Sequence, residues 1–468
     1  MTAGLRRGIG RLDAVALVVG SMIGSGIFIV SAESARRLGS PGWLLLAWIV
    51  PGALTLAASV SCAELAAMLP KAGGQYVFFR EAYGPLTGFL FGWAMFLVIQ
   101  TGTIAAVAVA FAKFLGVLWP AVTGAAVLRV GSLPISPVQL VALLVIALLT
   151  ATNVTGLEAG TRTQNVLTAV KLAALAALAL FGLLLGGGEN VALRAPGFFD
   201  ARPPGGGRLE GFALSAAFAA AMVGPLFSQS AWNNVTFAGE EIRNPARTLP
   251  WALWTGCLAV TSLYVLTNVS YLNVLTLAGI QHAPEDRVGT AAAAALFGPL
   301  GGRATAAAIM ASTFGCVNGL ILSGARVSFA MARDGLFFRR LSQLNRAAVP
   351  GNALWLQAGW AGLLVLTGTY SQLLKYVISA DILLYGLLVV AVIVLRRRHP
   401  EWDRPFRAPA YPWLQLLYAA AVALLIALLL SGSAASTWPG YAVLAAGVPA
   451  YFLWRRRSRS GLRKRESV

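Results

Sequence analysis

Long apolar runs separated by short polar segments dominate the pattern of this chain. Twelve of the runs are long enough to cross a bilayer as helices, because a span needs about 20 predominantly apolar residues. The predicted spans are residues 12–38, 42–69, 85–118, 136–157, 164–186, 211–238, 250–273, 302–332, 352–369, 371–395, 413–431 and 437–454. An even number of spans predicts that both termini lie on one side of the membrane.

The first run is interrupted by small residues, with Ser25 standing between Gly24 and Gly26. Glycine lacks the Cβ that favours helical backbone, so this stretch is a weak point in a membrane helix. A break at mid-bilayer is tolerated only against buried protein or a watery cavity, where its N–H groups can bind a carboxylate and its carbonyls a cation. The alternative is close helix packing, because Gly20 and Gly24 also form a small-xxx-small contact motif.

A second interruption lies in the sixth run, where residues 227–234 contain five polar side chains in eight. Interhelical hydrogen bonds are one explanation, since an unsatisfied polar group in hydrocarbon is costly. An unwound segment is the other. If spans 1–5 and 6–10 form two inverted halves, both interruptions fall at corresponding positions, which predicts a substrate site near the bilayer midplane.

Composition agrees with a membrane protein of many spans, since 58% of the 468 residues are hydrophobic and 11% are charged. The net charge of +19 lies mostly in alternate loops and at the chain ends. By the positive-inside rule this places both termini in the cytoplasm, and we expect a multi-pass protein of the plasma (cell inner) membrane. Cys62, Cys257 and Cys316 all fall within predicted spans, so we expect no disulfide-linked partner subunit.

Four motifs in order resemble the amino acid–polyamine–organocation superfamily, and within it the L-type amino acid transporter group. They are Gly20–Phe28 in the first span, Pro70–Tyr76 in the following loop, Ala231–Pro245 after the second interruption, and Ser312–Gly335 in the eighth span. One departure stands out. Relatives usually carry Gly-Gly before the Trp-Asn pair, where this chain has Ser230 and Ala231.

The resemblance implies an all-α polytopic fold of about twelve transmembrane helices. They would form a five-plus-five inverted repeat, as in sodium/leucine symporters, with two peripheral helices. The implied segments are a basic N-terminus (1–11), a first repeat (12–186), an extracellular loop (187–210), a second repeat (211–395), peripheral helices (396–454) and a basic cytoplasmic tail (455–468).

The resemblance also implies an amino acid as substrate, with N–H groups near Ser25 and Gly26 taking its carboxylate. Carbonyls around both interruptions would accept bonds from its ammonium group, and Phe227 would cover it from outside. Asn233 would either contact the substrate or hold the unwound segment. The full set of predicted substrate-binding residues is Met22, Ile23, Gly24, Ser25, Gly26, Phe227, Ser228, Ser230, Trp232 and Asn233.

Lys171 is a single lysine inside the predicted fifth span. It lies about 10 Å from the cytoplasmic end, so its side chain could snorkel back to water. The resemblance implies instead that its ammonium replaces a sodium ion, bonding carbonyls near Gly20 and the hydroxyl of Ser312. Sodium would then be redundant for transport.

These features predict a sodium-independent secondary transporter of neutral L-amino acids that works by alternating access as an exchanger. The proposed pocket has no acidic side chain to pair with a cationic substrate, and small to medium substrates are favoured if Ser230 and Ala231 narrow it. A proton-coupled symporter and a polyamine or cationic amino acid permease stay as alternatives.

Three acidic residues in or near the spans have other expected roles. Asp381 is an intramembrane carboxylate that could serve function or bond a neighbouring helix. We expect Glu240 and Glu241 to pair with Arg243. Neither a catalytic motif, nor a metal-ligand cluster, nor a cofactor motif is visible in the sequence, so enzyme chemistry has no support.

Overall fold

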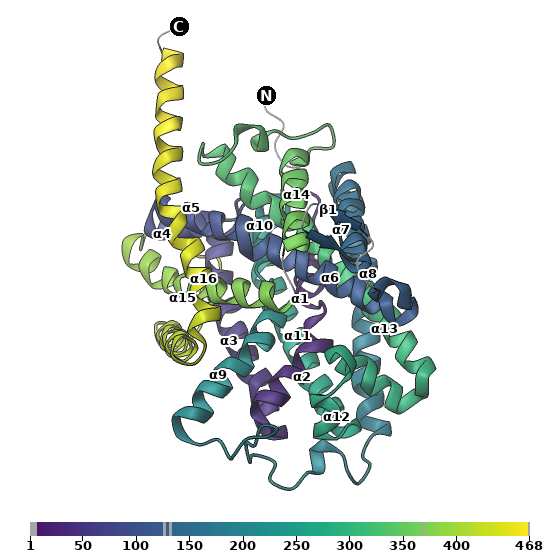
Figure 1. Cartoon of the computed structure of the whole chain (residues 1–468). Coiled ribbons are helices and arrows are strands. Elements are labelled where there is room, and N and C mark those ends of the chain that lie inside the picture. The colour runs from purple at the N-terminus through teal and green to yellow at the C-terminus, as the bar shows by residue number, and fades with distance from the viewer. Residues whose placement is uncertain (1–6, 125–127, 131–132, 368–369, 467–468) are drawn as a thin grey trace.

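The computed structural model describes residues 7–124, 128–130, 133–367 and 370–466, and these are almost entirely helical (Figure 1). The helices of the first half are α1 (Arg11–Met22), α2 (Gly26–Leu38), α3 (Pro41–Met68), α4 (Gln75–Tyr83), α5 (Pro85–Ala94), α6 (Gln100–Leu118), α7 (Pro137–Thr155) and α8 (Leu157–Leu185). A π-helical turn (Met95–Ile99) joins α5 to α6, and two short antiparallel strands, β1 (Leu128–Val130) and β2 (Leu133–Ile135), precede α7.

The helices of the second half continue the same pattern of long spans and short connecting turns. They are α9 (Gly211–Ser228), α10 (Asn234–Phe237), α11 (Pro245–Val274), α12 (Leu277–Gln281), α13 (Val288–Arg333), α14 (Gly351–Thr367), α15 (Tyr370–Arg398) and α16 (Trp413–Glu466). The fold is that of an all-α polytopic membrane protein. Of the predicted basic ends, residues 1–6 and 467–468 lie outside the described residues.

Nine helical stretches in the described part of the chain are long and apolar enough to cross a membrane. They correspond to nine of the predicted spans. The predicted spans 352–369, 371–395 and 437–454 correspond to α14, α15 and the later part of α16, with residues 368–369 outside the described residues.

Two helices extend beyond the apolar runs that predicted them. Helix α8 begins at Leu157 rather than at residue 164, because polar residues can continue a helix once it has left the hydrocarbon. Helix α13 begins at Val288 and bends sharply at Gly298, which has φ +69°. The bend follows from Pro299, whose ring disfavours helical backbone at the residue before it.

The interrupted first span lies at the centre of the bundle. In its most apolar window 89% of the residues of α1 and α2 are buried, against 28% in the first part of α16. Helices α8, α11 and α13 surround α1, whereas α16 lies at the periphery and its last turns project from the bundle (Figure 1). The first span is therefore enclosed by protein, which is the setting that a broken membrane helix requires.

Candidate functional site

The first interruption lies where the glycine pattern predicted it, at residues 23–25 between α1 and α2. Ile23 has extended backbone (φ −76°, ψ 93°), and Ser25 makes no side-chain cap on α2. Backbone bonding in α2 begins with Phe28 N–H donating to the Ser25 carbonyl at 3.1 Å. The N–H groups of Gly26 and Ile27 precede that bond and sit at the positive end of the helix dipole.

Close packing and helix interruption coincide in this stretch. A Cβ added to Gly20 would lie 1.8 Å from Nε2 of Gln164, and one added to Gly24 would lie 3.0 Å from Sγ of Cys316. Both glycines therefore bring the first span close to α8 and α13, as the contact-motif alternative predicts. The two explanations apply to the same segment rather than competing.

The second interruption runs from the end of α9 at Ser228 to the start of α10 at Asn234. Ala231 has φ +65°, a left-handed conformation that glycine adopts without strain. Ala231 is therefore strained at a position whose backbone suits glycine. The Ser230 hydroxyl donates to the Phe227 carbonyl at 2.8 Å and so satisfies one of the last carbonyls of α9.

The two interruptions touch each other at the centre of the bundle. A Cβ on Gly26 would lie 2.0 Å from the Ser228 Oγ atom, so only glycine permits this approach. The hydroxyl of Tyr264, from α11, lies 3.0 Å from the Met22 carbonyl and 3.2 Å from the Ser228 carbonyl. One hydroxyl proton serves two acceptors, so these carbonyls retain lone pairs for another donor.

Lys171 reaches the first interruption from α8. Its Nζ atom donates to the carbonyls of Gly20 at 2.6 Å, Ile23 at 2.9 Å and Ser312 at 3.2 Å. The side chain is 1% exposed, so it points inward and does not snorkel to the cytoplasm. The predicted bond to the Ser312 hydroxyl is wrong in one respect: the acceptor is the Ser312 carbonyl, and the hydroxyl donates to the Ile23 carbonyl at 3.3 Å instead. All three ammonium protons have acceptors, as a buried cation requires.

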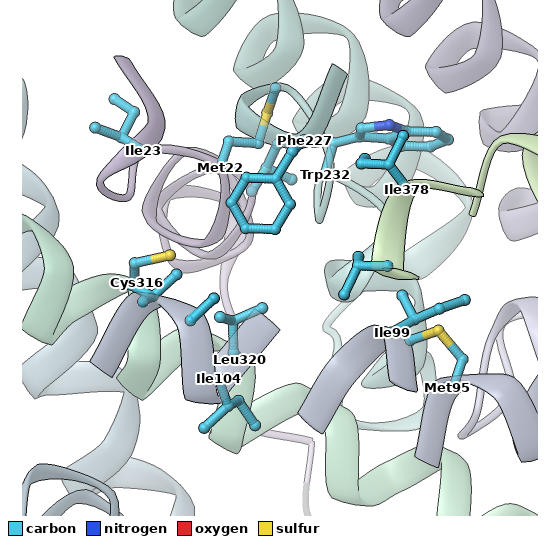
Figure 2. Packing of buried hydrophobic residues seen from close by; sticks show 14 of the residues in the cluster. Met22, Ile23, Met95, Ile99, Ile104, Phe227, Trp232, Cys316, Leu320 and Ile378 are labelled. Carbon is cyan, nitrogen blue, oxygen red and sulfur yellow. The ribbon is translucent and has the colours of Figure 1, made fainter. Parts of the chain in front are cut away.

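A cluster of apolar side chains lies beside the two interruptions. Figure 2 shows Met22, Phe227 and Trp232 converging from different segments into one buried cluster, with Ile104 of α6 and Leu320 of α13. The Trp232 indole stacks on the Tyr385 ring of α15, with centroids 5.3 Å apart. This environment suits an uncharged side chain rather than a charged one.

Asn233 is held by two side chains from other segments. Its Nδ2 donates to Oε1 of Gln75 at 2.8 Å, and the Tyr385 hydroxyl donates to its Oδ1 at 3.3 Å. Of the two predicted roles, this geometry agrees with holding the unwound segment in place. The neighbouring Gln229 also behaves as an interhelical tie, because its amide bonds the Trp48 carbonyl and the Thr261 hydroxyl.

The acidic residues after the second interruption pair with arginines of α13, not with Arg243 as predicted. Glu241 accepts two bonds from Arg326, at 2.7 and 3.0 Å, and both side chains are 1% exposed. Glu240 pairs with Arg333 at 3.1 Å near the surface. Helix α13 packs beside this segment, and the spacing of residues along the chain does not predict that contact.

Several residues that organise the site were missed at the sequence level, namely Gln75, Tyr264, Arg326 and Tyr385. A weak signal existed for two of them, because a tyrosine inside an apolar span must find a partner for its hydroxyl. The local sequence does not predict which residue bonds the tyrosine hydroxyl.

The tight contact at Gly26 gives a first prediction. Replacing Gly26 with valine should abolish substrate binding, because the added Cβ displaces Ser228 and separates the two interruptions. Binding to purified protein in detergent would measure this, with folding checked by gel filtration. The paired change Gly26→Ala with Ser228→Gly removes the obstructing hydroxymethyl group and should recover part of the affinity. Unchanged affinity in the valine variant would contradict the placement of the substrate here.

Two interrupted membrane helices that meet at a buried centre define this molecule as a secondary transporter of the broken-helix type, not an enzyme. Residues 9–451 match the family model described as amino acid permease, and the chain belongs to that family within the amino acid–polyamine–organocation superfamily. It is 30% identical over 460 residues to the serine/threonine exchanger SteT of Bacillus subtilis (strain 168), covering 98% of this chain and 99% of that one.

Two human proteins are similarly related to the chain. The large neutral amino acids transporter small subunit 2 is 31% identical over 458 residues, which cover 96% of this chain and 80% of the relative. The b(0,+)-type amino acid transporter 1 is 30% identical over 417 residues, which cover 87% of this chain and 80% of the relative. Amino acid transport is thus the common activity in these names.

Proposed function

We propose that this chain exchanges neutral L-amino acids across the membrane, without sodium, by alternating access around the two interruptions. The observation that carries the proposal is the Lys171 ammonium on three backbone carbonyls beside the first interruption. Such a carbonyl cluster is what a monovalent cation would bind, and the lysine ammonium, which is held in place by the chain, supplies that charge from within the protein. Transport then needs no sodium ion to complete the site.

The two ends of an amino acid substrate would bind opposite poles of the broken helices. The N–H groups at the start of α2, near Ser25 and Gly26, would hold the carboxylate. The carbonyls of Met22 and Ser228 would accept hydrogen bonds from the substrate ammonium group, in addition to those that they accept from the Tyr264 hydroxyl. Ile23, predicted as a third acceptor, is better assigned to the Lys171 site, because its carbonyl already accepts from Lys171 and Ser312.

The side chain of the substrate would face an uncharged wall. Met22, Phe227 and Trp232 lie in the apolar cluster, and Ser230 is bonded back to its own segment. A cationic substrate would bury an unpaired charge, at a cost of several kcal/mol, or roughly a thousandfold in affinity. The names of two relatives support the proposal, since one is an exchanger of serine and threonine and the other a transporter of large neutral amino acids.

Exchange assays in proteoliposomes test this proposal. Uptake of labelled serine or leucine should require unlabelled neutral amino acid inside the vesicle and should persist when choline replaces sodium. In a competition panel of twenty amino acids, neutral ones should inhibit at least a hundredfold more strongly than arginine or lysine. Stronger competition by arginine or lysine would favour the cationic or polyamine permease alternative and refute the proposal.

Proton-coupled symport is a second candidate, and one buried carboxylate favours it. Asp381 is 4% exposed, and no salt bridge to it occurs among the described residues. It interacts with the Tyr385 side chain and lines a cavity of about 20 Å³ beside Trp232, together with Tyr418. That volume admits about one water molecule, which could exchange a proton with the carboxylate next to the unwound segment.

A proton gradient separates the two candidates. If the carboxylate couples transport, acid outside should drive uptake into empty vesicles, and Asp381→Asn should abolish this drive while exchange continues. The exposed Asp403→Asn is the matched control, because it removes one carboxylate from a loop. Equal responses of wild type and Asp381→Asn to the gradient would exclude this role of the carboxylate.

We also propose that the protein lies in the plasma (cell inner) membrane with both termini in the cytoplasm. Basic residues concentrate in the loops on the side of the termini, in agreement with the positive-inside rule. No covalent partner subunit is part of the proposal, because Cys62, Cys257 and Cys316 are buried in α3, α11 and α13. Cysteine labelling of tagged termini and non-reducing electrophoresis of the cell membrane fraction test these points.

A further inference from the structure

A groove of about 580 Å³ lies between the ends of α1, α3 and α11 and the loop before α16, away from the two interruptions. The groove is lined by Arg11 from the first turn of α1, and by Arg247, Trp251 and Trp254 from the first turns of α11. The loop contributes Phe406 and Arg407. Three chain segments far apart in sequence thus bring three arginines and three aromatic rings to one place.

The three arginines are exposed and have no carboxylate partner within the described part of the chain. The Arg11 guanidinium lies over the Trp251 ring, 4.9 Å from its centroid. Neighbouring carboxylates are already engaged elsewhere. Asp13 accepts bonds from Gly10 and Asn165, and Glu64 binds Arg396, Arg404 and the Ala408 N–H group. The groove therefore carries a net positive charge that the protein itself leaves uncompensated.

The wall of the groove that α11 forms continues along that helix as an apolar stripe. Trp251 is 47% exposed, Trp254 44% and Leu258 40%, and their spacing places them on one face of the helix. Helix α11 crosses the membrane, so this stripe runs from the end of the bundle into the depth of the hydrocarbon. Tryptophans at such a boundary are typical of the membrane interface.

We propose that this groove binds one anionic phospholipid, with its phosphate held by Arg11, Arg247 and Arg407 and an acyl chain along Trp254 and Leu258. Guanidinium groups bind phosphate oxygens through paired N–H bonds, and the apolar stripe supplies the part of the site that a free phosphate could not use. The lipid would belong to the leaflet on the side of the chain termini, which is the inner leaflet in the proposed orientation. Binding itself does not depend on that orientation or on the transported substrate.

Native mass spectrometry of the delipidated full-length protein tests the proposal, with phosphatidylglycerol, phosphatidylcholine and glycerol 1-phosphate as separate probes. One phosphatidylglycerol per chain should bind saturably and more tightly than phosphatidylcholine. The triple change Arg11→Gln, Arg247→Gln, Arg407→Gln should weaken this binding roughly a hundredfold, at about 1 kcal/mol per basic residue. Replacing the same three arginines with lysine keeps the charge without the paired N–H bonds, so this variant should retain more affinity than the glutamine variant but less than the wild type.

A charge-matched control is available at another exposed basic cluster outside the groove. The triple change Arg339→Gln, Arg340→Gln, Arg346→Gln removes the same charge and should leave phosphatidylglycerol affinity within twofold. An equal loss in both triple variants would mean general charge attraction and overturn the site. Equal binding of phosphatidylcholine, or binding of glycerol 1-phosphate as tight as that of the lipid, would overturn it as well.

Discussion

Replacing Lys171 with alanine should lower the rate of amino acid exchange at least a hundredfold, while substrate affinity changes by less than tenfold. The ammonium bonds the carbonyls of Gly20, Ile23 and Ser312, and hydrogen bonds to a charged group contribute about 1.5–3 kcal/mol each. Losing them frees the first interruption from α8 and α13. The lysine contacts the first interruption rather than the proposed substrate position. The rate of the conformational change should therefore fall more than the substrate affinity.

Two matched variants separate charge from volume and from packing. Lys171→Met keeps most of the side-chain volume without the charge and should be as inactive as the alanine variant. Thr168→Ala lies one turn earlier on the same helix and removes a 3.2 Å bond to the Ala16 carbonyl, outside the interruption. It should retain near-normal exchange. Full turnover in Lys171→Ala, or collapse of wild-type uptake on removing sodium, would refute the proposed role of this lysine.

Replacing Arg326 with glutamine should destabilise the folded protein by about 3–5 kcal/mol, because it leaves Glu241 charged and buried without its partner. The pair is 1% exposed on both sides and has two bonds, at 2.7 and 3.0 Å. It connects the segment after the second interruption to α13. The midpoint of heat inactivation in detergent, measured at a fixed heating rate, would report the loss.

The neighbouring pair provides the control for this effect. Glu240 and Arg333 come from the same two segments, but their side chains are 30% and 52% exposed. Water already solvates both charges, so Arg333→Gln should cost at most about 1 kcal/mol. Replacing both buried partners, with Arg326→Met and Glu241→Leu, should recover much of the stability lost in Arg326→Gln. Similar inactivation midpoints for Arg326→Gln and Arg333→Gln would show that burial of the first pair has no energetic consequence.

The spans and the two interruptions could be predicted from sequence because both are local properties. An apolar run of about 20 residues has few alternatives to a membrane helix, since its backbone must satisfy its own hydrogen bonds in hydrocarbon. Glycines around Ser25 and polar residues after Phe227 disturb that pattern within a few positions, so they are readable in a short window. Helices α8 and α13 begin before the predicted spans because helices continue past the hydrocarbon, where hydropathy no longer limits them.

The partners of buried polar groups could not be predicted in the same way. Lys171 and Gly20 are 151 residues apart, and Tyr264 and Met22 are 242 apart. A hydrogen bond forms only within about 3 Å, so its acceptor is chosen by how whole helices pack. This is why the lysine could be expected near the first interruption by resemblance while its third acceptor, the Ser312 carbonyl, was assigned to the wrong atom. The same limit hid Tyr264 and the Arg326 partner of Glu241.

By itself, the sequence determined a polytopic helical membrane protein of the amino acid permease family, with weak points in its first and sixth spans and one lysine inside the fifth. Those properties depend on residue types within short segments, namely one apolar run for each span and four motifs in order for the family resemblance. The tertiary structure decided that the two weak points touch at Gly26 and Ser228, and that Lys171 and Tyr264 hold their carbonyls. It also decided that Arg11, Arg247 and Arg407 share one groove. These contacts depend on the distances between helices. Helix packing sets those distances, and a local pattern of residues does not predict them.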